Sequence, residues 1–193
     1  MKQLLLTACL SLFTIGLSAQ VVYVNDDVTT PGDGSSWDNA FANLNDALLA
    51  APSGSEVWIA QGTYITPDST AFIVDNKSLT ILGGFVGNET MASEADPEKN
   101  ATILSGDVLQ DDVQGSYDSL SRADNQRVLI VADTNQVSTH TVNIDGLIIQ
   151  DGHIIDAWAD TLSLVPFAGG GLWATGKVNV SRTTFRANFA PFG

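Results

Sequence analysis

Short runs in which apolar and polar residues alternate recur along most of the chain. Alternation with a period of two predicts β-strands that bury one face, and the Gly, Asn, Asp and Pro residues between the runs are typical of turns. After residue 54 no segment has convincing helical periodicity. We therefore expect short strands at 21–24, 56–60, 71–74, 78–82, 101–104, 127–131, 141–149 and 177–185.

The segment 37–49 departs from this alternation. Its apolar residues recur at helical spacing and form one stripe, made of Trp37, Phe41, Leu44 and Leu48. Ser35 and Asp38 are spaced as in a capping box at the start of a helix. The pattern predicts a single amphipathic helix over this segment.

Two of the expected strands resemble each other in sequence. VNIDGLIIQDG at 142–152 and VNVSRTTFRAN at 178–188 share their first two residues, and apolar side chains recur at matching positions, 36 residues apart. An irregular insert at 153–168 accounts for much of that offset, and without it the spacing is roughly twenty-odd residues, a scale typical of repeat proteins. The self-similarity favours a solenoid over a closed sandwich or barrel.

The segment 23–64 is similar to the opening of secreted bacterial right-handed parallel β-helix proteins, the pectate-lyase-like superfamily. Those proteins begin with a YV strand, a polar loop that ends in G-x-S-W, a capping helix with an A-L pair, and a strand followed by A-x-G-T-Y. In this chain Ser55-Glu56 follows Gly54, where many members of that group have Asp and a variable residue after the glycine. The stretches at 78–90 and 100–107 resemble the next coils of that group.

GGGL at 169–172 and FRAN at 185–188 resemble the signatures of polymorphic outer-membrane-protein repeats, of the type found in Bacteroidetes. The resemblance implies an all-β fold, a right-handed parallel β-helix with an N-terminal amphipathic capping helix. That helix would cover the coil that contains Val57 and Ile59, because the end coil of a solenoid exposes its interior. Glycines at 83–84 and 169–171 would form tight corners with positive φ.

The apolar pattern at 169–193 has no terminating element after it. We therefore expect residues 20–193 to be the N-terminal part of a β-helix domain in a longer polypeptide, truncated here at the C-terminus. Further coils and a sorting or anchoring domain would follow. The 193 residues, 44% of them hydrophobic, suffice for one sizeable core.

The first residues are typical of a secretory signal peptide, with a basic Lys2, an apolar run and small residues at Ser18 and Ala19. We expect cleavage after Ala19 and a secreted or outer-surface location. The sequence LTAC, which ends at Cys9, offers the alternative of a lipoprotein, but the apolar stretch before it is very short. Cys9 is the only cysteine, so cleavage leaves no thiol.

The chain carries 22 acidic against 8 basic residues, a formal net charge of −14. Such a surface repels phosphate backbones and excludes nucleic acid as the expected partner. Asp107, Asp111 and Asp112 form a local cluster that could hold calcium, because hard cations take carboxylate oxygens. A merely solvated acidic surface is the alternative interpretation, and no other cofactor is expected.

Many pectate-lyase-like proteins cleave acidic polysaccharides with calcium and a basic residue that removes a proton. The resemblance makes Arg127, Arg182 and Arg186 the available bases, although no lyase signature is present. A glycoside hydrolase would instead need two positioned carboxylates, for which Asp145 and Asp151 are candidates. None of these groups is fixed in one place by the sequence, so no catalytic residue is assigned.

Trp158 and Trp173 are candidates to stack on sugar rings, whereas Trp58, inside a predicted strand, is expected in the core or in the stacking between coils. Two functional classes follow. The first is a secreted or cell-surface β-helix scaffold, adhesin-like or carbohydrate-contacting and without catalysis, whose partners would be extracellular polysaccharide or cell-surface glycans. The second is a polysaccharide-active enzyme, a calcium-dependent lyase before a hydrolase.

Overall fold

The computed structural model describes residues 19–67, 70–113, 121–135, 139–154 and 169–190. The predicted signal peptide therefore lies almost wholly outside the described residues. Strands dominate, and every strand pair is parallel. The expectation of a β-rich fold with parallel pairing is confirmed.

The strands form three sheets. The first has the order β1-β2-β5-β8-β11, with β1 (Val21–Val24), β2 (Ser55–Ala60), β5 (Leu79–Phe85), β8 (Thr141–Asp145) and β11 (Lys177–Ser181). The second has the order β12-β9-β6-β3, with β3 (Gly62–Ile65), β6 (Thr102–Ser105), β9 (Leu147–Gln150) and β12 (Thr184–Arg186). The third has the order β10-β7-β4, with β4 (Phe72–Asp75), β7 (Leu129–Ala132) and β10 (Leu172–Ala174).

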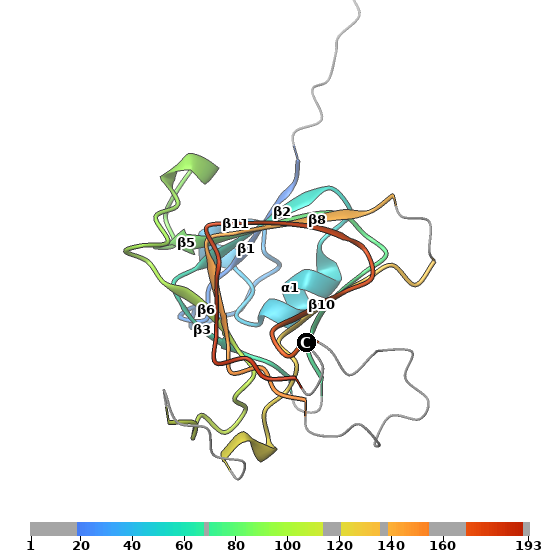
Figure 1. The fold of residues 1–193 in the computed structure, drawn as a ribbon. Helices are drawn as coiled ribbons and strands as arrows, with labels where there is room; N and C mark the ends of the chain where they lie inside the picture. Colours follow the sequence, from blue (N-terminus) through green and yellow to red (C-terminus); the bar gives the residue numbers. More distant parts are fainter. Residues whose placement is uncertain (1–18, 68–69, 114–120, 136–138, 155–168, 191–193) are drawn as a thin grey trace, which may run out of the picture.

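From β2 onward, consecutive strands enter the first, second and third sheets in turn (Figure 1). The predicted strands are all present, most of them within two residues of the expected ends. The predicted strand 141–149 is divided into β8 and β9 by Gly146, whose φ is +73°. The predicted strand 177–185 is likewise divided into β11 and β12. Each division marks the place where the chain passes from the first sheet to the second.

The expected single helix over 37–49 is wrong. A 3-10 helix η1 (Trp37–Asn39) and the α-helix α1 (Leu44–Ala50) take its place. Between them Phe41 is extended, and its backbone N–H donates to Tyr23 O at 2.9 Å while its carbonyl accepts from Asn25 N at 2.9 Å. Pairing with the chain at β1 therefore overrides the helical periodicity of this segment.

Each of these short helices has its own N-cap. The hydroxyl of Ser36, rather than the predicted Ser35, accepts from Asn39 N at the start of η1. The side-chain oxygen of Asn43 accepts from two backbone N–H groups in the first turn of α1. Two further 3-10 helices are η2 (Ala92–Glu94) and η3 (Ser121–Ala123). Among the described residues, no helix has both the length and the apolar character needed to cross a membrane.

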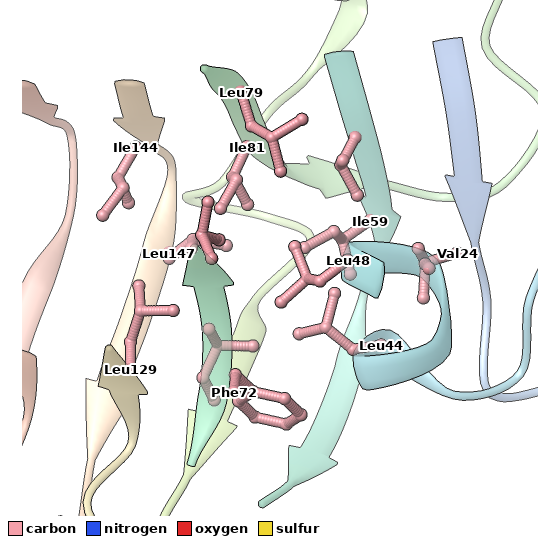
Figure 2. Packing of buried hydrophobic residues seen from close by; sticks show 14 of the residues in the cluster. Val24, Leu44, Leu48, Ile59, Phe72, Leu79, Ile81, Leu129, Ile144 and Leu147 are labelled. Carbon is pink, nitrogen blue, oxygen red and sulfur yellow. The ribbon is translucent and has the colours of Figure 1, made fainter. Parts of the chain in front are cut away.

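The apolar core lies in the space that the three sheets enclose, and α1 packs into it against β1 and β4 (Figure 2). Leu44 and Leu48 are buried in the same cluster as Val57 and Ile59, which the sequence expected the helix to cover. Trp58 points out of this cluster but is also buried, stacked on Phe85 with ring centroids 4.8 Å apart. The apolar face of α1 thus covers the start of the core.

The C-terminal end of α1 is held by a lysine from the next part of the chain. The ammonium of Lys77 donates to the carbonyls of Leu48, Leu49 and Ala51 at 2.6–3.1 Å. The last carbonyls of a helix lack partners within the helix, and a cation there also suits the helix dipole. Burial lowers the pKa of Lys77 from its usual range.

In-register pairing aligns like side chains in rows across the sheets. The Val22 row crosses the first sheet and consists of Val22, Val57, Ile81, Ile144 and Val180. The Tyr64 row crosses the second sheet and consists of Tyr64, Leu104, Ile149 and Phe185. The 36-residue similarity read from the sequence is therefore a spatial register, because residues 141–145 and 148–150 each lie beside the residue 36 positions later.

The glycines at the expected corners serve two different needs. Gly84 and Gly169 have positive φ, at +94° and +78°, which glycine adopts readily. Gly83 does not, but a Cβ there would lie 2.6 Å from Gly146 O. The expectation of positive φ is thus confirmed at Gly84 and Gly169 and wrong at Gly83, Gly170 and Gly171. At Gly83 and Gly170 a neighbouring backbone carbonyl leaves no room for a Cβ.

Gly152→Ala tests this close approach. A Cβ at Gly152 would overlap the backbone carbonyl of Gly170, so we expect the free energy of unfolding to fall by about 1–3 kcal/mol, the usual cost of overpacking. Urea unfolding followed by circular dichroism measures it. Gly176→Ala is the control, since its Cβ would make ordinary contacts at 3.7 Å. Equal losses in both variants would contradict the close-approach explanation.

Candidate functional site

A cavity of about 430 Å³ opens beside the second sheet. Part of its lining is a polar row of in-register neighbours, Ser105, Gln150 and Arg186, at the ends of β6, β9 and β12. The residues that follow parallel strands gather at one edge of a sheet, and Asp107 and Asp151 line the cavity from there. Asp112 completes its acidic wall.

Asp107 organises the loop that follows β6. It is buried, and its carboxylate accepts the backbone N–H groups of Asp111 at 3.2 Å and Asp112 at 3.1 Å. Its own N–H donates to Ser105 Oγ at 3.3 Å. The acidic cluster that the sequence predicted at Asp107, Asp111 and Asp112 is therefore a turn, and hydrogen bonds to the Asp107 carboxylate hold it together.

Asp124 joins this turn from a later part of the chain. Carboxylate oxygens of Asp107, Asp111 and Asp124 all lie within 4.8 Å of one another. Asp124 also accepts the backbone N–H of Leu109 at 2.7 Å. Desolvation, followed by the charges of Asp124, Asp107 and Asp112, raises the pKa of Asp111. These oxygens could hold a hard cation, which would relieve the repulsion among them.

Asp112, the third residue that the sequence assigned to calcium, has different neighbours. Its carboxylate accepts from Asn125 Nδ2 at 2.6 Å and lies 3.7 Å from Arg122 Nη1. Both side chains of that ion pair are almost fully buried. The structure therefore groups Asp107 and Asp111 with Asp124, and it places Asp112 in an adjacent buried network.

Asn125 connects this network to the turn after β9. Besides Asp112, its Nδ2 reaches Asp151 O at 2.8 Å, and the residue is only 4% exposed. Its Oδ1 is buried and has no hydrogen-bond partner within the described residues. A buried amide oxygen without a hydrogen-bond partner lowers the stability of the fold. Such an oxygen can also serve as a metal ligand, and Asn125 contacts Asp112 next to the acidic turn.

Asp151 faces the cavity from a strained position. Its φ is +57°, and Ala187, its in-register counterpart after β12, has φ +53°. Burial and then the charge of Asp112 raise the pKa of the Asp151 carboxyl, while Arg122 and Arg186 oppose this effect. The sequence offered Asp145 and Asp151 as candidates for a pair of hydrolase carboxylates, but only Asp151 lines this cavity.

Asp145 belongs to the first sheet and is held by an arginine. Arg182 Nε and Nη2 donate to its two carboxylate oxygens at 2.8 and 2.9 Å. This pairing lowers the pKa of Asp145 and raises that of Arg182. The structure therefore separates Asp145 from the cavity and engages one of the three arginines proposed as bases.

The other two arginines also have partners. Arg186 Nε donates to Gln150 Oε1 at 2.7 Å within the cavity lining. Arg127 Nε donates to Gly169 O at 3.2 Å, and its guanidinium lies 5.8 Å from the ring centroid of Trp173. Trp173 is partly buried on β10 of the third sheet and does not line this cavity. Trp158 lies outside the described residues.

Asp151→Asn tests the electrostatic cost of this acidic wall. A raised carboxyl pKa means that the folded state holds its proton more tightly, so ionisation of Asp151 lowers stability as the pH rises above the ordinary value of 3.8. We expect the variant to be more stable than the parent at pH 7, with the gain vanishing near pH 3. Urea unfolding at both pH values measures this.

Asp145→Asn is the matched control for that measurement. The pKa of Asp145 is lowered, so its ionised form stabilises the fold above pH 3.8 and this stabilisation disappears as the pH falls through the folded pKa. We therefore expect the opposite sign, a loss of stability at pH 7. A gain at pH 7 in both variants would indicate a general charge effect instead.

Comparison of the chain with protein-family models, curated proteins and solved structures finds no match. The family resemblance of segment 23–64 stays a prediction from the sequence. The functional proposal therefore relies on the strand register and the chemistry of the cavity.

Proposed function

We propose that this chain is a secreted or cell-surface scaffold, a right-handed parallel β-helix that contacts carbohydrate and does not catalyse a reaction. The strand order supports the solenoid, since successive strands enter three parallel sheets in turn and residues 36 positions apart stack in register. Crossovers between parallel strands are almost always right-handed. Export follows from the signal-peptide pattern of residues 1–19.

The observation that carries the carbohydrate proposal is the polar cavity beside the second sheet. Arg186 and Gln150 supply hydrogen-bond donors, and Asp107, Asp112 and Asp151 supply acceptors. Sugar hydroxyls both donate and accept, so this mixed lining suits a neutral or sparsely charged glycan better than a polyanion. Extracellular polysaccharide or cell-surface glycans are the proposed partners. Trp173 is a second candidate contact, on the third sheet.

The enzymatic alternative is a polysaccharide lyase or glycoside hydrolase. A lyase base must be deprotonated, but arginine keeps its proton, and the ion pair with Asp145 raises the pKa of Arg182 further. The raised pKa of Asp151 is the observation that favours an enzyme, because a hydrolase needs a carboxyl that stays protonated beside an ionised one. These points favour a hydrolase over a lyase within the alternative.

A binding and turnover assay tests the proposed function. We expect retarded migration of the full chain in native gels that contain a soluble polysaccharide, from a panel that includes pectin, alginate and neutral glucans. Arg186→Gln should weaken retardation about tenfold, since it removes a charge-assisted hydrogen bond. Arg182→Gln, which changes the same residue type outside this cavity, should leave it unchanged. Weaker retardation of Trp173→Ala would show that the polysaccharide also contacts the third sheet.

The same polysaccharides are incubated with the protein to detect turnover. Unsaturated uronate products, which absorb in the ultraviolet, would identify a lyase, and new reducing ends without this absorbance would identify a hydrolase. Either product, if lost in Asp151→Asn, would contradict the scaffold proposal. Absence of binding to every polymer would contradict the carbohydrate proposal.

Calcium is the metal proposed for the turn after β6. Asp107, Asp111 and Asp124 would hold it, because their carboxylate oxygens are close together and calcium takes six to eight oxygen ligands. The buried, unpartnered Oδ1 of Asn125 lies in the adjoining network and supports this donor set. Bound calcium would fix the wall of the cavity rather than take part in a reaction.

Calcium addition should stabilise the protein, by about 2.7 kcal/mol at one hundred times the dissociation constant. Thermal unfolding with calcium and then with a chelator measures this. Asp124→Asn should remove most of the effect, whereas Asp112→Asn should remove less, because Asp112 is paired with Asn125. If Asp112→Asn reduced the stabilisation by calcium more than Asp124→Asn did, the calcium ligands would be Asp107, Asp111 and Asp112, as the sequence predicted. Equal unfolding temperatures with and without calcium would contradict the metal proposal.

A further inference from the structure

A second cavity, of about 630 Å³, opens on the outer face of the second sheet. Ile148 on β9 and Thr184 on β12 form part of its floor, and Asp96 and Glu98 line it from the segment between β5 and β6. We call it the Glu98 cavity, and we call the first cavity, which Arg186 lines, the Arg186 cavity. Each has the size of a site for one small ligand.

Strand β9 connects the two cavities. It lies between β6 and β12, so both of its edges are paired. Leu147 and Ile149 point into the core, whereas Ile148 and Gln150 are partly exposed on the outer face. Ile148 lines the Glu98 cavity and Gln150 lines the Arg186 cavity. Residues two positions apart on a strand are separated by about 7 Å, so the two cavities adjoin each other.

A row of outward side chains also passes from one cavity to the other. The Thr63 row consists of Thr63, Ile103, Ile148 and Thr184, which pair in register across the second sheet. Thr63 lines the Arg186 cavity, whereas Ile148 and Thr184 line the Glu98 cavity. Ile103 lies between them and is partly exposed. The floor between the cavities is therefore apolar in the middle and carries a hydroxyl at each end.

The walls of the two cavities come from the segments on either side of β6. These segments project at opposite ends of the strands of the second sheet (Figure 1). Asp96 N and Asn100 Nδ2 fix the wall of the Glu98 cavity, because both donate to Gly84 O, at 2.8 and 3.1 Å. Hydrogen bonds to the Asp107 carboxylate hold the wall of the Arg186 cavity. The face thus has an ordered wall at each end of its strands.

Both ends of this face are acidic. Asp96 and Glu98 line the Glu98 cavity, and the Arg186 cavity has an acidic wall of Asp107, Asp112 and Asp151. Negative charge at both ends repels a polymer of uronic acids. The apolar floor between the ends suits the C–H faces of sugar rings, which gain by leaving water. The charges and the floor together favour an uncharged glycan.

Arg182 also lines the Glu98 cavity, but its charge is already compensated. Two of its guanidinium nitrogens donate to the carboxylate of Asp145. An acidic sugar would have to compete with this carboxylate, so we do not assign Arg182 to ligand binding. Arg182→Gln therefore still serves as the control for the Arg186 cavity.

We propose that the two cavities are the ends of one groove, which binds an internal stretch of an uncharged polysaccharide extended along the strand direction. This inference rests on the proposed carbohydrate function, and it adds the length and the charge class of the ligand. Sugar rings would lie over Ile103 and Ile148. Their hydroxyl groups would bind Thr184 and Glu98 at one end, and Gln150 and Arg186 at the other. A single sugar would occupy one cavity only.

The dependence of affinity on ligand length tests the single groove. The probes are linear gluco-oligosaccharides of one to six units, prepared from the neutral glucans of the panel, and isothermal titration calorimetry with the full chain gives their affinities. We expect the six-unit probe to bind at least about tenfold more tightly than the two-unit probe, because only the longer one reaches both cavities.

Variants in the Glu98 cavity should act on the long probe only. Ile148→Thr removes apolar floor and should weaken binding of the six-unit probe about tenfold, with less than about a twofold effect on the two-unit probe. Glu98→Ala, at an exposed residue outside the core, should act in the same direction. Arg186→Gln should weaken both probes.

Ile73→Thr is the matched control for Ile148→Thr. Ile73 is an isoleucine on the outer face of β4 in the third sheet, and it is partly exposed like Ile148. This variant should bind every probe as the parent does. Circular dichroism and thermal unfolding check that each variant folds.

The outcomes separate this inference from the proposed function. Equal affinities for all probe lengths, or equal losses for both probes in Ile148→Thr and Glu98→Ala, would overturn the single groove and leave carbohydrate binding intact. Tighter binding of pectin or alginate than of neutral glucans would overturn the uncharged class. Absence of binding to every polymer of the panel would instead reject the carbohydrate proposal itself.

Discussion

Parallel pairing in register is the constraint on which the rest of this structure depends. Because the strands of a sheet lie beside one another in register, apart from one shift between Trp58 and Ala60 where β2 pairs with β5, like side chains stack in the Val22 and Tyr64 rows. A slip of one residue would turn every apolar side chain of a strand to the opposite face. The sheets are therefore held by the same contacts that fill the interior, and the turns must fit the register that the strands impose.

The turns show how closely that register controls the backbone. Gly83 near the end of β5 lies against Gly146, and Gly152 lies against Gly170, at distances that leave no room for a Cβ at Gly83 or Gly152. After the strands of the second sheet, the equivalent positions Asp151 and Ala187 both take a positive φ although neither is glycine. The conformation of these turns is thus imposed by the strands on either side, and the residue type is secondary.

The same arrangement builds the candidate site. Residues that follow β6, β9 and β12 meet at one edge of the second sheet, so Asp107, Asp151 and Arg186 line one cavity although they are far apart in sequence. Asp112 also lines this cavity, and its hydrogen bond with Asn125 and its ion pair with Arg122 form a buried polar network at the same edge. The site is therefore a consequence of stacking, with its chemistry supplied by loops that the register brings together.

The sequence by itself determined the strands other than β3 and β10, the 36-residue register and the burial of Trp58, because alternation and self-similarity are local patterns that backbone pairing preserves. It also located Asp107 and Asp111. Only the tertiary structure decided that Phe41 pairs with β1 and interrupts the predicted helix, and that Asp124 takes the place of Asp112 in the acidic cluster. These outcomes depend on contacts between residues distant in the chain, whose geometry no local pattern encodes.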